Sequence, residues 1–375
     1  MRGGEYRWKE EWNSRGTPRI PERSSGDEAS SSKFRVCFHH EKESVMKKFA
    51  FFATVAAAVA FTIGAADAAE RYRFGGGPSG GAWHPSISAG TQLLNRKIGR
   101  KFYFQYSPSA GSVANVRRVS LGEFATSWGH VGQVYQSWTG TGLFKKDGAN
   151  KDFRIVANVR AQSQIIAVLA DSTIKSYKDM AGKRVNLLKQ GTGSHVNCKN
   201  IFAAVGLTDK IQPRYLGFSA SGRALGDRQI DVYCSAGAPF TIPALTRLSI
   251  QKPVRYISLS EAEQKKVTDA HKFYVPITIP VQKEVRGMKE PARSIAYDVW
   301  WIAHKQMSND AVYNMLKVIA APENLKQLTK TARYWRDLSG NFNALKVHKI
   351  WVHPAAARYW KERGVKVPAE VVKGF

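Results

Sequence analysis

The segment RFGGGPSGGAWHP, residues 73–85, contains a Gly-x-Gly-x-x-Gly spacing that begins at Gly75 and also occurs in dinucleotide-binding loops. Such a site needs an acidic residue about 20 positions downstream to bind the ribose hydroxyls. No Asp or Glu lies between Glu70 and Glu123, whereas eight Lys or Arg residues do. Pro78 also removes one amide donor from the loop. The sequence therefore argues against NAD or FAD, and the lack of a following Lys-Ser or Lys-Thr pair excludes a Walker A loop.

Two further glycine loops precede predicted helices. Residues 191–194, Gly-Thr-Gly-Ser, lie between a predicted strand and a predicted helix, and residues 110–112, Ala-Gly-Ser, open a helix that carries Asn115. At such loops the backbone amides and the positive helix N-terminus can bind an anion. For any single loop, an ordinary strand-to-helix turn is an equally good interpretation. Three loops of this kind in one basic chain favour an anionic ligand such as a carboxylate.

Signatures of enzymes and metal centres are poor in this sequence. A G-x-S-x-G spacing occurs once, from Gly77 to Gly81 within the glycine loop, and there is no H-E-x-x-H and no paired-cysteine metal motif. The histidines are scattered, and we interpret most of them as surface or capping residues. His130 and His195 are candidates for ligand contacts, His195 because it opens the helix after the loop at residues 191–194, whereas Trp300-Trp301 is interpreted as core. We therefore expect no catalytic residue, no metal and no cofactor.

The N-terminal region has the pattern of a secretory signal peptide. Two lysines follow Met46, residues 49–66 form an apolar run, and Ala-Asp-Ala ends at Ala68. A membrane anchor is the alternative, but the run is rich in alanine and lacks basic stop-transfer residues. We expect residues 46–68 to be a cleaved signal peptide and the protein to be periplasmic. Residues 1–45 are polar and irregular, and we expect a disordered, non-native upstream extension there.

The charge balance is strongly basic, with 57 Lys and Arg against 29 Asp and Glu and a formal net charge of +28. Residues 69–375 retain 46 basic and 20 acidic residues, so the basicity belongs to the folded part. These basic residues are dispersed without a nucleic-acid motif, so we expect no nucleic-acid partner. Cys198 and Cys234 are the cysteines of this part. In an oxidising compartment they could form a disulfide, and two separate buried thiols are an equally good interpretation.

Alternating short strands and helices predict an α/β fold. The predicted strands are residues 101–106, 154–159, 165–170, 184–188, 211–216, 230–237 and 254–259. Helices are predicted near residues 87–98, 112–121, 195–206, 219–229, 309–320 and 354–363. Ser112 and Ser308 are predicted N-caps, and Pro354 is predicted at a first helical position.

Five segments of the chain resemble motifs of the TAXI family of TRAP-transporter solute-binding proteins. They are FGGGPSGGAWHP (74–85), SAGSVANVRRVSLGE (109–123), IKSYKDMAGKRVNLLKQGTGS (174–194), IDVYCSAGAPFTIPAL (230–245) and HPAAARYWKERG (353–364). No single segment is specific, but the five occur in the family's order. Together they span nearly all of the chain that follows the predicted signal peptide.

The resemblance implies a periplasmic-binding-protein fold of the type II-like, Venus-flytrap kind, in which two α/β lobes are joined by a hinge. We expect one lobe at residues 70–163 plus 275–375 and the other at residues 164–274. The resemblance further implies a monomeric receptor for a small carboxylate or other organic anion. Its partners would be TRAP membrane permease subunits, which take up the ligand by ion-coupled transport.

The predicted ligand contacts combine the glycine loops with the resemblance. They are Ser79, Gly80, Gly81, Trp83, Ser112, Asn115, His130, Thr192, Gly193, Ser194, Gly237 and Pro239. The chain departs from the family at Ala125, where an Asp is common, and at Lys189 and Gln190 in the third loop. These departures leave the ligand open and favour an atypical or more acidic one.

The sequence leaves two alternatives open. A receptor of the same fold could signal to a membrane histidine kinase instead of serving a permease. A periplasmic enzyme on an α/β scaffold is the other alternative, and the missing nucleophile and base argue against it.

Overall fold

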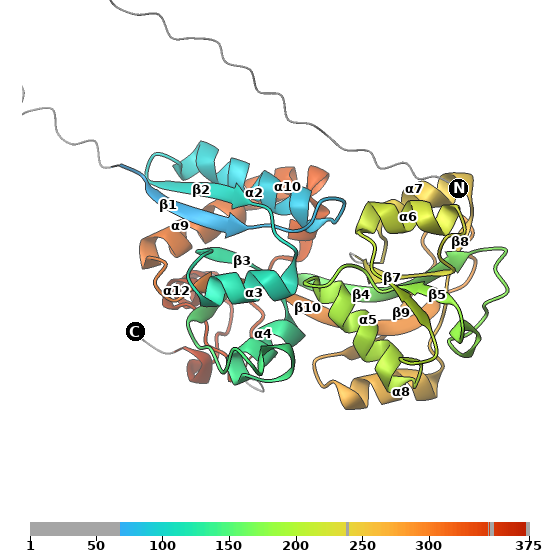
Figure 1. The fold of residues 1–375 in the computed structure, drawn as a ribbon. Coiled ribbons are helices and arrows are strands. Elements are labelled where there is room, and N and C mark those ends of the chain that lie inside the picture. Colours follow the sequence, from blue (N-terminus) through green and yellow to red (C-terminus); the bar gives the residue numbers. More distant parts are fainter. Residues whose placement is uncertain (1–67, 238–239, 344, 346–348, 373–375) are drawn as a thin grey trace, which may run out of the picture. The chain divides into compact units, whose positions relative to one another are not determined.

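The structure is a computed structural model that describes residues 68–237, 240–343, 345 and 349–372 (Figure 1). These residues belong to one unit, Asp67–Phe375. The predicted extension at 1–45, the predicted signal peptide up to residue 67, and Pro239 lie outside the described residues. None of the described helices is long and apolar enough to cross a membrane.

The described elements alternate between strands and helices along the chain. The strands are β1 (Glu70–Gly75), β2 (Phe102–Ser107), β3 (Thr126–His130), β4 (Phe153–Leu169), β5 (Arg184–Asn186), β6 (Gln212–Arg214), β7 (Val232–Gly237), β8 (Val254–Tyr256), β9 (Val275–Ile279) and β10 (Ala292–His304). The α-helices are α2 (Trp83–Ile98), α3 (Ser112–Ser120), α4 (Val131–Thr139), α5 (Gly193–Ala204), α6 (Phe218–Gly226), α7 (Pro243–Gln251), α8 (Glu261–Ala270), α9 (Asn309–Ile319), α10 (Pro322–Thr331) and α12 (Pro354–Glu362). Short 3₁₀ turns are η1 (Gly142–Phe144), η2 (Lys178–Met180), η3 (Arg333–Asp337) and η4 (Ala369–Val371).

The strands form one sheet in the order β2-β1-β3-β10-β4-β7-β5-β6, with β8 beside β4 and β9 beside β10. The outer strands pair in parallel on both sides, whereas β4 and β10 pair antiparallel with their neighbours. Parallel strands need helical crossovers, and the helices between them cover the sheet. The α/β class predicted from the sequence is therefore confirmed.

Two long strands connect the two lobes of this sheet (Figure 1). The first lobe holds β1–β3 with α2–α4, α9, α10 and α12, and the second lobe holds β5–β9 with α5–α8. The first half of β4 pairs with β10, and its second half pairs with β7 and β8. In turn, β10 pairs with β9 through its first half and with β3 through its second half. Each long strand thus contributes to both lobes.

The sequence predicted two strands at 154–159 and 165–170, but the structure has the single strand β4. The intervening residues Arg160, Gln162 and Gln164 are polar, which favoured a break in the strand. All three are nonetheless buried, and Arg160 forms an ion pair with Asp337 at 2.6 Å. The polar run is therefore a buried part of the strand rather than a loop.

Helix ends agree with the sequence at two positions and differ at one. Ser308 caps α9 by accepting a hydrogen bond from the Ala311 amide, and Pro354 begins α12. The prediction that Ser112 caps α3 is wrong. Gly111, with a φ of 112°, takes the N-cap position, and Ser112 is the first helical residue. Its hydroxyl is thereby free to bind groups outside the helix.

Candidate functional site

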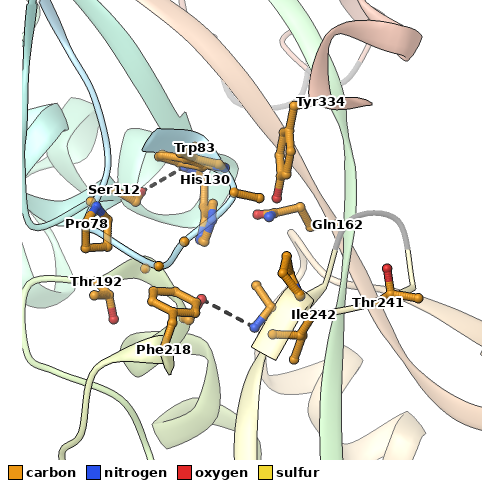
Figure 2. Close-up of a pocket in the computed structure, with 18 residues that line it drawn as sticks. Pro78, Trp83, Ser112, His130, Gln162, Thr192, Phe218, Thr241, Ile242 and Tyr334 are labelled. Carbon is orange, nitrogen blue, oxygen red and sulfur yellow. Dashed lines mark hydrogen bonds between the residues drawn. The ribbon is translucent and has the colours of Figure 1, made fainter. Parts of the chain in front are cut away.

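One cavity, partly open to solvent, lies between residues of the two lobes. First-lobe residues line one side, and residues of α5, α6 and the β7–α7 segment line the other. Figure 2 shows the side chains of His130, Gln162 and Phe218 around one space, with Trp83 beside His130 and Tyr334 above Gln162. The lining residues are Pro78, Gly80, Gly81, Ala82, Trp83, Gly111, Ser112, His130, Gln162, Thr192, Gly193, Ser194, Phe218, Ala236, Thr241, Ile242, Pro243 and Tyr334.

Six helices point their N-termini at this cavity. The lining includes the first residue or the N-cap of α2, α3, α4, α5, α6 and α7. A helix N-terminus carries unpaired amide donors and about half a positive charge. Six of them around one cavity create a region that favours an anion.

The first turns of these six helices also contain no acidic residue. Of the four described α-helices that do not line the cavity, α8, α9 and α10 have Glu261 and Glu263, Asp310 and Glu323 in their first turns, whereas α12 has no acidic residue there. Acidic side chains at a helix N-terminus neutralise its charge and stabilise the helix. Their absence at all six cavity helices leaves the positive ends available to a ligand.

Most of the residues predicted from the sequence lie at this cavity. The lining contains Gly80, Gly81, Trp83, Ser112, His130, Thr192, Gly193 and Ser194. Ser79 is exposed and outside the lining, and Gly237 is buried next to the lining residue Ala236. Asn115 is fully buried behind the cavity, where its side-chain amide donates to the Gly76 and Trp128 carbonyls at 2.9 and 3.0 Å. In this structure Asn115 therefore holds the first glycine loop against β3.

Ser112 connects α3 to the start of α4. Its hydroxyl oxygen accepts a hydrogen bond from the His130 amide at 2.8 Å, and the hydroxyl donates to Gln133 Oε1 at 3.2 Å. Both Ser112 and Gln133 are buried. This pair fixes the N-terminus of α4 next to that of α3, which explains how two helix ends reach the same cavity.

His130 is a neutral polar group in the wall. Burial lowers the pKa of its imidazole to about 3, and the nearby Gln162 side chain opposes this only in part. The ring packs edge-on against Trp83, with centroids 5.2 Å apart, and lies 3.4 Å (Nδ1) from Asn197 Nδ2. At neutral pH the imidazole therefore offers hydrogen bonding without charge.

His195, the other histidine candidate, does not line the cavity. Its backbone amide donates to the Thr192 hydroxyl at 3.0 Å, so Thr192 is the cap of α5. The His195 ring lies 3.2 Å (Nδ1) from the Leu187 carbonyl oxygen. The ring is therefore directed toward the strand side of the loop.

Glycines allow the two lobes to approach closely beside the cavity. A Cβ atom at Gly193 would lie 2.3 Å from His130 Nδ1 and 2.8 Å from Ser112 Cβ. One at Gly80, whose φ is 80°, would lie 2.5 Å from Ser219 Oγ on α6. The glycines of the first and third loops thus serve close packing across the cavity as well as amide exposure.

Sequence reasoning missed several residues of the wall. Gln162 lies in the middle of β4, and Tyr334 lies in η3, far along the chain. Phe218 opens α6 directly after Gly217, and this junction is a fourth glycine-to-helix signal that the sequence did contain. The other residues missed are Pro78, Ala82, Ala236, Thr241, Ile242 and Pro243, whereas Gly111 belongs to the predicted loop at 110–112.

Cys198 and Cys234 form a disulfide, with Cα atoms 6.1 Å apart. It links α5, whose N-terminus lines the cavity, to β7, which ends beside it. Gln164 donates from Nε2 to both sulfur atoms, at 3.0 and 3.3 Å, and accepts from the Tyr297 hydroxyl at 3.0 Å. The wall made by the second lobe is therefore cross-linked directly behind the site.

Comparison with known proteins gives one family match. The model of the NMT1-like family matches residues 74–364, which include every described lining residue of the cavity. Among solved structures, the alkanesulfonate-binding protein SsuA from Xanthomonas axonopodis pv. citri is 14% identical to this chain, with a TM-score of 0.43. The alignment covers 82% of this chain and 97% of the SsuA chain. SsuA from Escherichia coli is 14% identical with a TM-score of 0.41, covering 80% and 96%. A binding protein component of an ABC phosphonate transporter from Pseudomonas aeruginosa is 12% identical with a TM-score of 0.49, covering 81% and 92%.

Proposed function

The chain belongs to the NMT1-like family, and we propose that it is a periplasmic receptor that captures a small organic anion between its two lobes. One observation carries this proposal: six helix N-termini, all without an acidic residue in the first turn, surround the cavity. Backbone amides and hydroxyls there can bind an anion without a dedicated arginine. A carboxylate is our first candidate for the anionic group.

In this proposal the Ser194 hydroxyl and the loop amides bind the anionic group, and Trp83 covers the apolar part of the ligand. The Ser112 and Thr192 hydroxyls, which donate to Gln133 and to the Lys189 carbonyl, hold the loops in position. Ser79, Asn115 and Gly237 support the loops from outside the lining. Release of the ligand requires the lobes to separate. The pairing of β9 with the first half of β10 favours a boundary near Ala296 for the second lobe, later than the predicted residue 274.

We further propose that the receptor delivers its ligand to TRAP membrane permease subunits. The resemblance of five segments to the TAXI family supports this partner. Export is supported by the signal-peptide pattern at residues 46–68.

The electrostatic part of the proposal can be tested at Thr192, the cap of α5. Asp and Asn both cap helices well and differ in charge. We expect Thr192→Asp to weaken binding of an anionic ligand by about 10-fold or more, since it places a negative charge at the anion site. Thr192→Asn should change binding much less, and both variants should fold.

The measurement is ligand-induced thermal stabilisation with a panel of small carboxylates, together with mass spectrometry of any ligand that co-purifies. Equal stabilisation of the Asp and Asn variants by the same anion would place the anion site elsewhere.

A further inference from the structure

The cavity wall combines its amide donors with a large apolar surface. Trp83 and Tyr334 are 7% and 3% exposed, and they flank the space together with Phe218, Ile242 and Pro243. Figure 2 shows Phe218 and Ile242 on the opposite side of this space from Trp83 and His130. A ligand that fills the cavity must therefore bring an apolar body as well as an anionic group.

No Asp, Glu, Lys or Arg is among the residues that line the cavity in the described part of the chain. The wall has neutral acceptors instead. Gln162 is 4% exposed, its Oε1 atom has no hydrogen-bond partner, and its amide points into the space in Figure 2. The imidazole of His130 beside it is neutral at neutral pH.

This wall is unfavourable for an ammonium group. An anionic partner offsets the lost hydration of a buried primary ammonium group best, and the described lining contains no carboxylate side chain. The six helix N-termini add a positive potential, which repels a cation as strongly as it attracts an anion. A zwitterionic amino acid would thus lose at its ammonium group much of what its carboxylate gains.

We propose that the ligand is a non-zwitterionic organic acid, with one anionic group, an apolar or aromatic body and no ammonium group. This inference rests on the proposed function, because it specifies the ligand of the same cavity. Gln162 and the neutral His130 imidazole are the neutral polar side chains at the centre of this wall.

The test compares ligand pairs that differ only in the ammonium group. One pair is 3-phenylpropanoate and L-phenylalanine, and the other is 4-methylpentanoate and L-leucine. Titration calorimetry measures the affinity of the protein for each ligand. The protein is first freed of co-purified ligand by unfolding and refolding. We expect at least one deaminated acid to bind about 10-fold or more tightly than its amino acid, because an unpaired buried ammonium is costly.

A negative charge introduced at Gln162 tests whether the missing anionic partner causes the preference for the deaminated acids. Gln162→Glu places a carboxylate in the wall and should shift the preference of each pair toward the amino acid by about 10-fold or more. Gln162→Met, similar in size and neutral, should keep the preference for the deaminated acid. A loss of folding would weaken the binding of both ligands of a pair. A change in the ratio of their two affinities therefore reports the effect of the charge and not a structural defect.

The outcomes separate this inference from the proposed function. Amino acids that bind as tightly as their deaminated partners overturn the inference and leave an anion receptor in place. If neither series binds, and Thr192→Asp binds every other anion as the wild type does, both the inference and the anion site are overturned.

Discussion

His130 links the chemistry of the site to a measurable pH dependence. Its folded-state pKa is about 3, whereas an unperturbed histidine titrates near 6.5. Between these values the unfolded chain binds a proton that the folded protein does not bind. The contribution of His130 to the free energy of unfolding is therefore fully present above pH 6.5 and decreases as the pH falls toward 3, by about 1.4 kcal/mol per pH unit. We expect His130→Asn to reduce this slope by about one proton, measured by urea unfolding between about pH 4.5 and 6.

His353 provides a matched control away from the cavity. It caps α12, and burial lowers its pKa to about 4. Asn is also a good cap, so His353→Asn should reduce the pH slope while the ligand affinity is unchanged. An unchanged slope in His130→Asn would show that the buried imidazole is protonated in the folded protein.

At the level of single residues, the sequence indicated those parts of the site that follow local rules. Gly193 and Ser194 were predictable because a glycine loop before a helix exposes amides whatever the rest of the fold does. Gln162 and Tyr334 were not predictable, because strand pairing brings them together from distant positions. The pairing of Asn158 with Ser339, for example, positions the chain just after η3 beside β4.

At the level of elements, the common property of the site is the direction of its helices. Three of the six N-termini follow glycine loops that the sequence made visible. The start of α4 did not stand out, since β3 ends at His130 and the helix begins at the next residue. The start of α7 at Pro243 has no glycine loop directly before it. Convergence of all six is a property of the sheet topology, and no local pattern encodes it.

The contact between α5 and the first lobe gives a prediction at this scale. Gly193→Ala adds a Cβ atom that would meet the His130 ring at 2.3 Å. Alanine is acceptable in the first turn of a helix, so α5 itself should remain intact. Overpacking of this size costs about 1–3 kcal/mol, and here it opposes the approach of the lobes. We expect ligand affinity measured by calorimetry to fall by about 10-fold.

Gly90→Ala is the matched control for this variant. Its Cβ atom would meet the Trp335 ring at 2.7 Å inside the first lobe, and neither Gly90 nor Trp335 lines the cavity. It should lower thermal stability while the affinity of the folded protein stays near the wild-type value. Wild-type affinity in Gly193→Ala would mean that the loops need not approach this closely in the bound state.

At the scale of the whole molecule, the two lobes share strands rather than meeting through flexible linkers. Both β4 and β10 continue from one lobe into the other, and Ser163 pairs with Ala296 at the point where β4 changes partners from β10 to β7. Separation of the lobes must therefore bend two paired strands near these residues. The predicted lobe boundary between residues 163 and 164 lies at this point, but the sequence could not show that a continuous strand crosses it, because the polar residues there hide the alternating pattern of a strand.

The basic surface gives the last prediction. The described cavity lining has no charged side chain, yet residues 69–375 carry a net charge of +26. Attraction of an anion from a distance must therefore come from the surface, which includes Arg223 and Arg247 beside α6 and α7. Salt screens such long-range forces, since the Debye length falls from about 30 Å at 0.01 M to about 8 Å at 0.15 M. The association rate of an anionic ligand in stopped-flow experiments should fall several-fold over this range. The dissociation rate should change little, because the amide contacts of the bound ligand are short-range and lie inside the cavity. If both rates respond equally, the charge acts at the binding site itself and does not steer the ligand toward it.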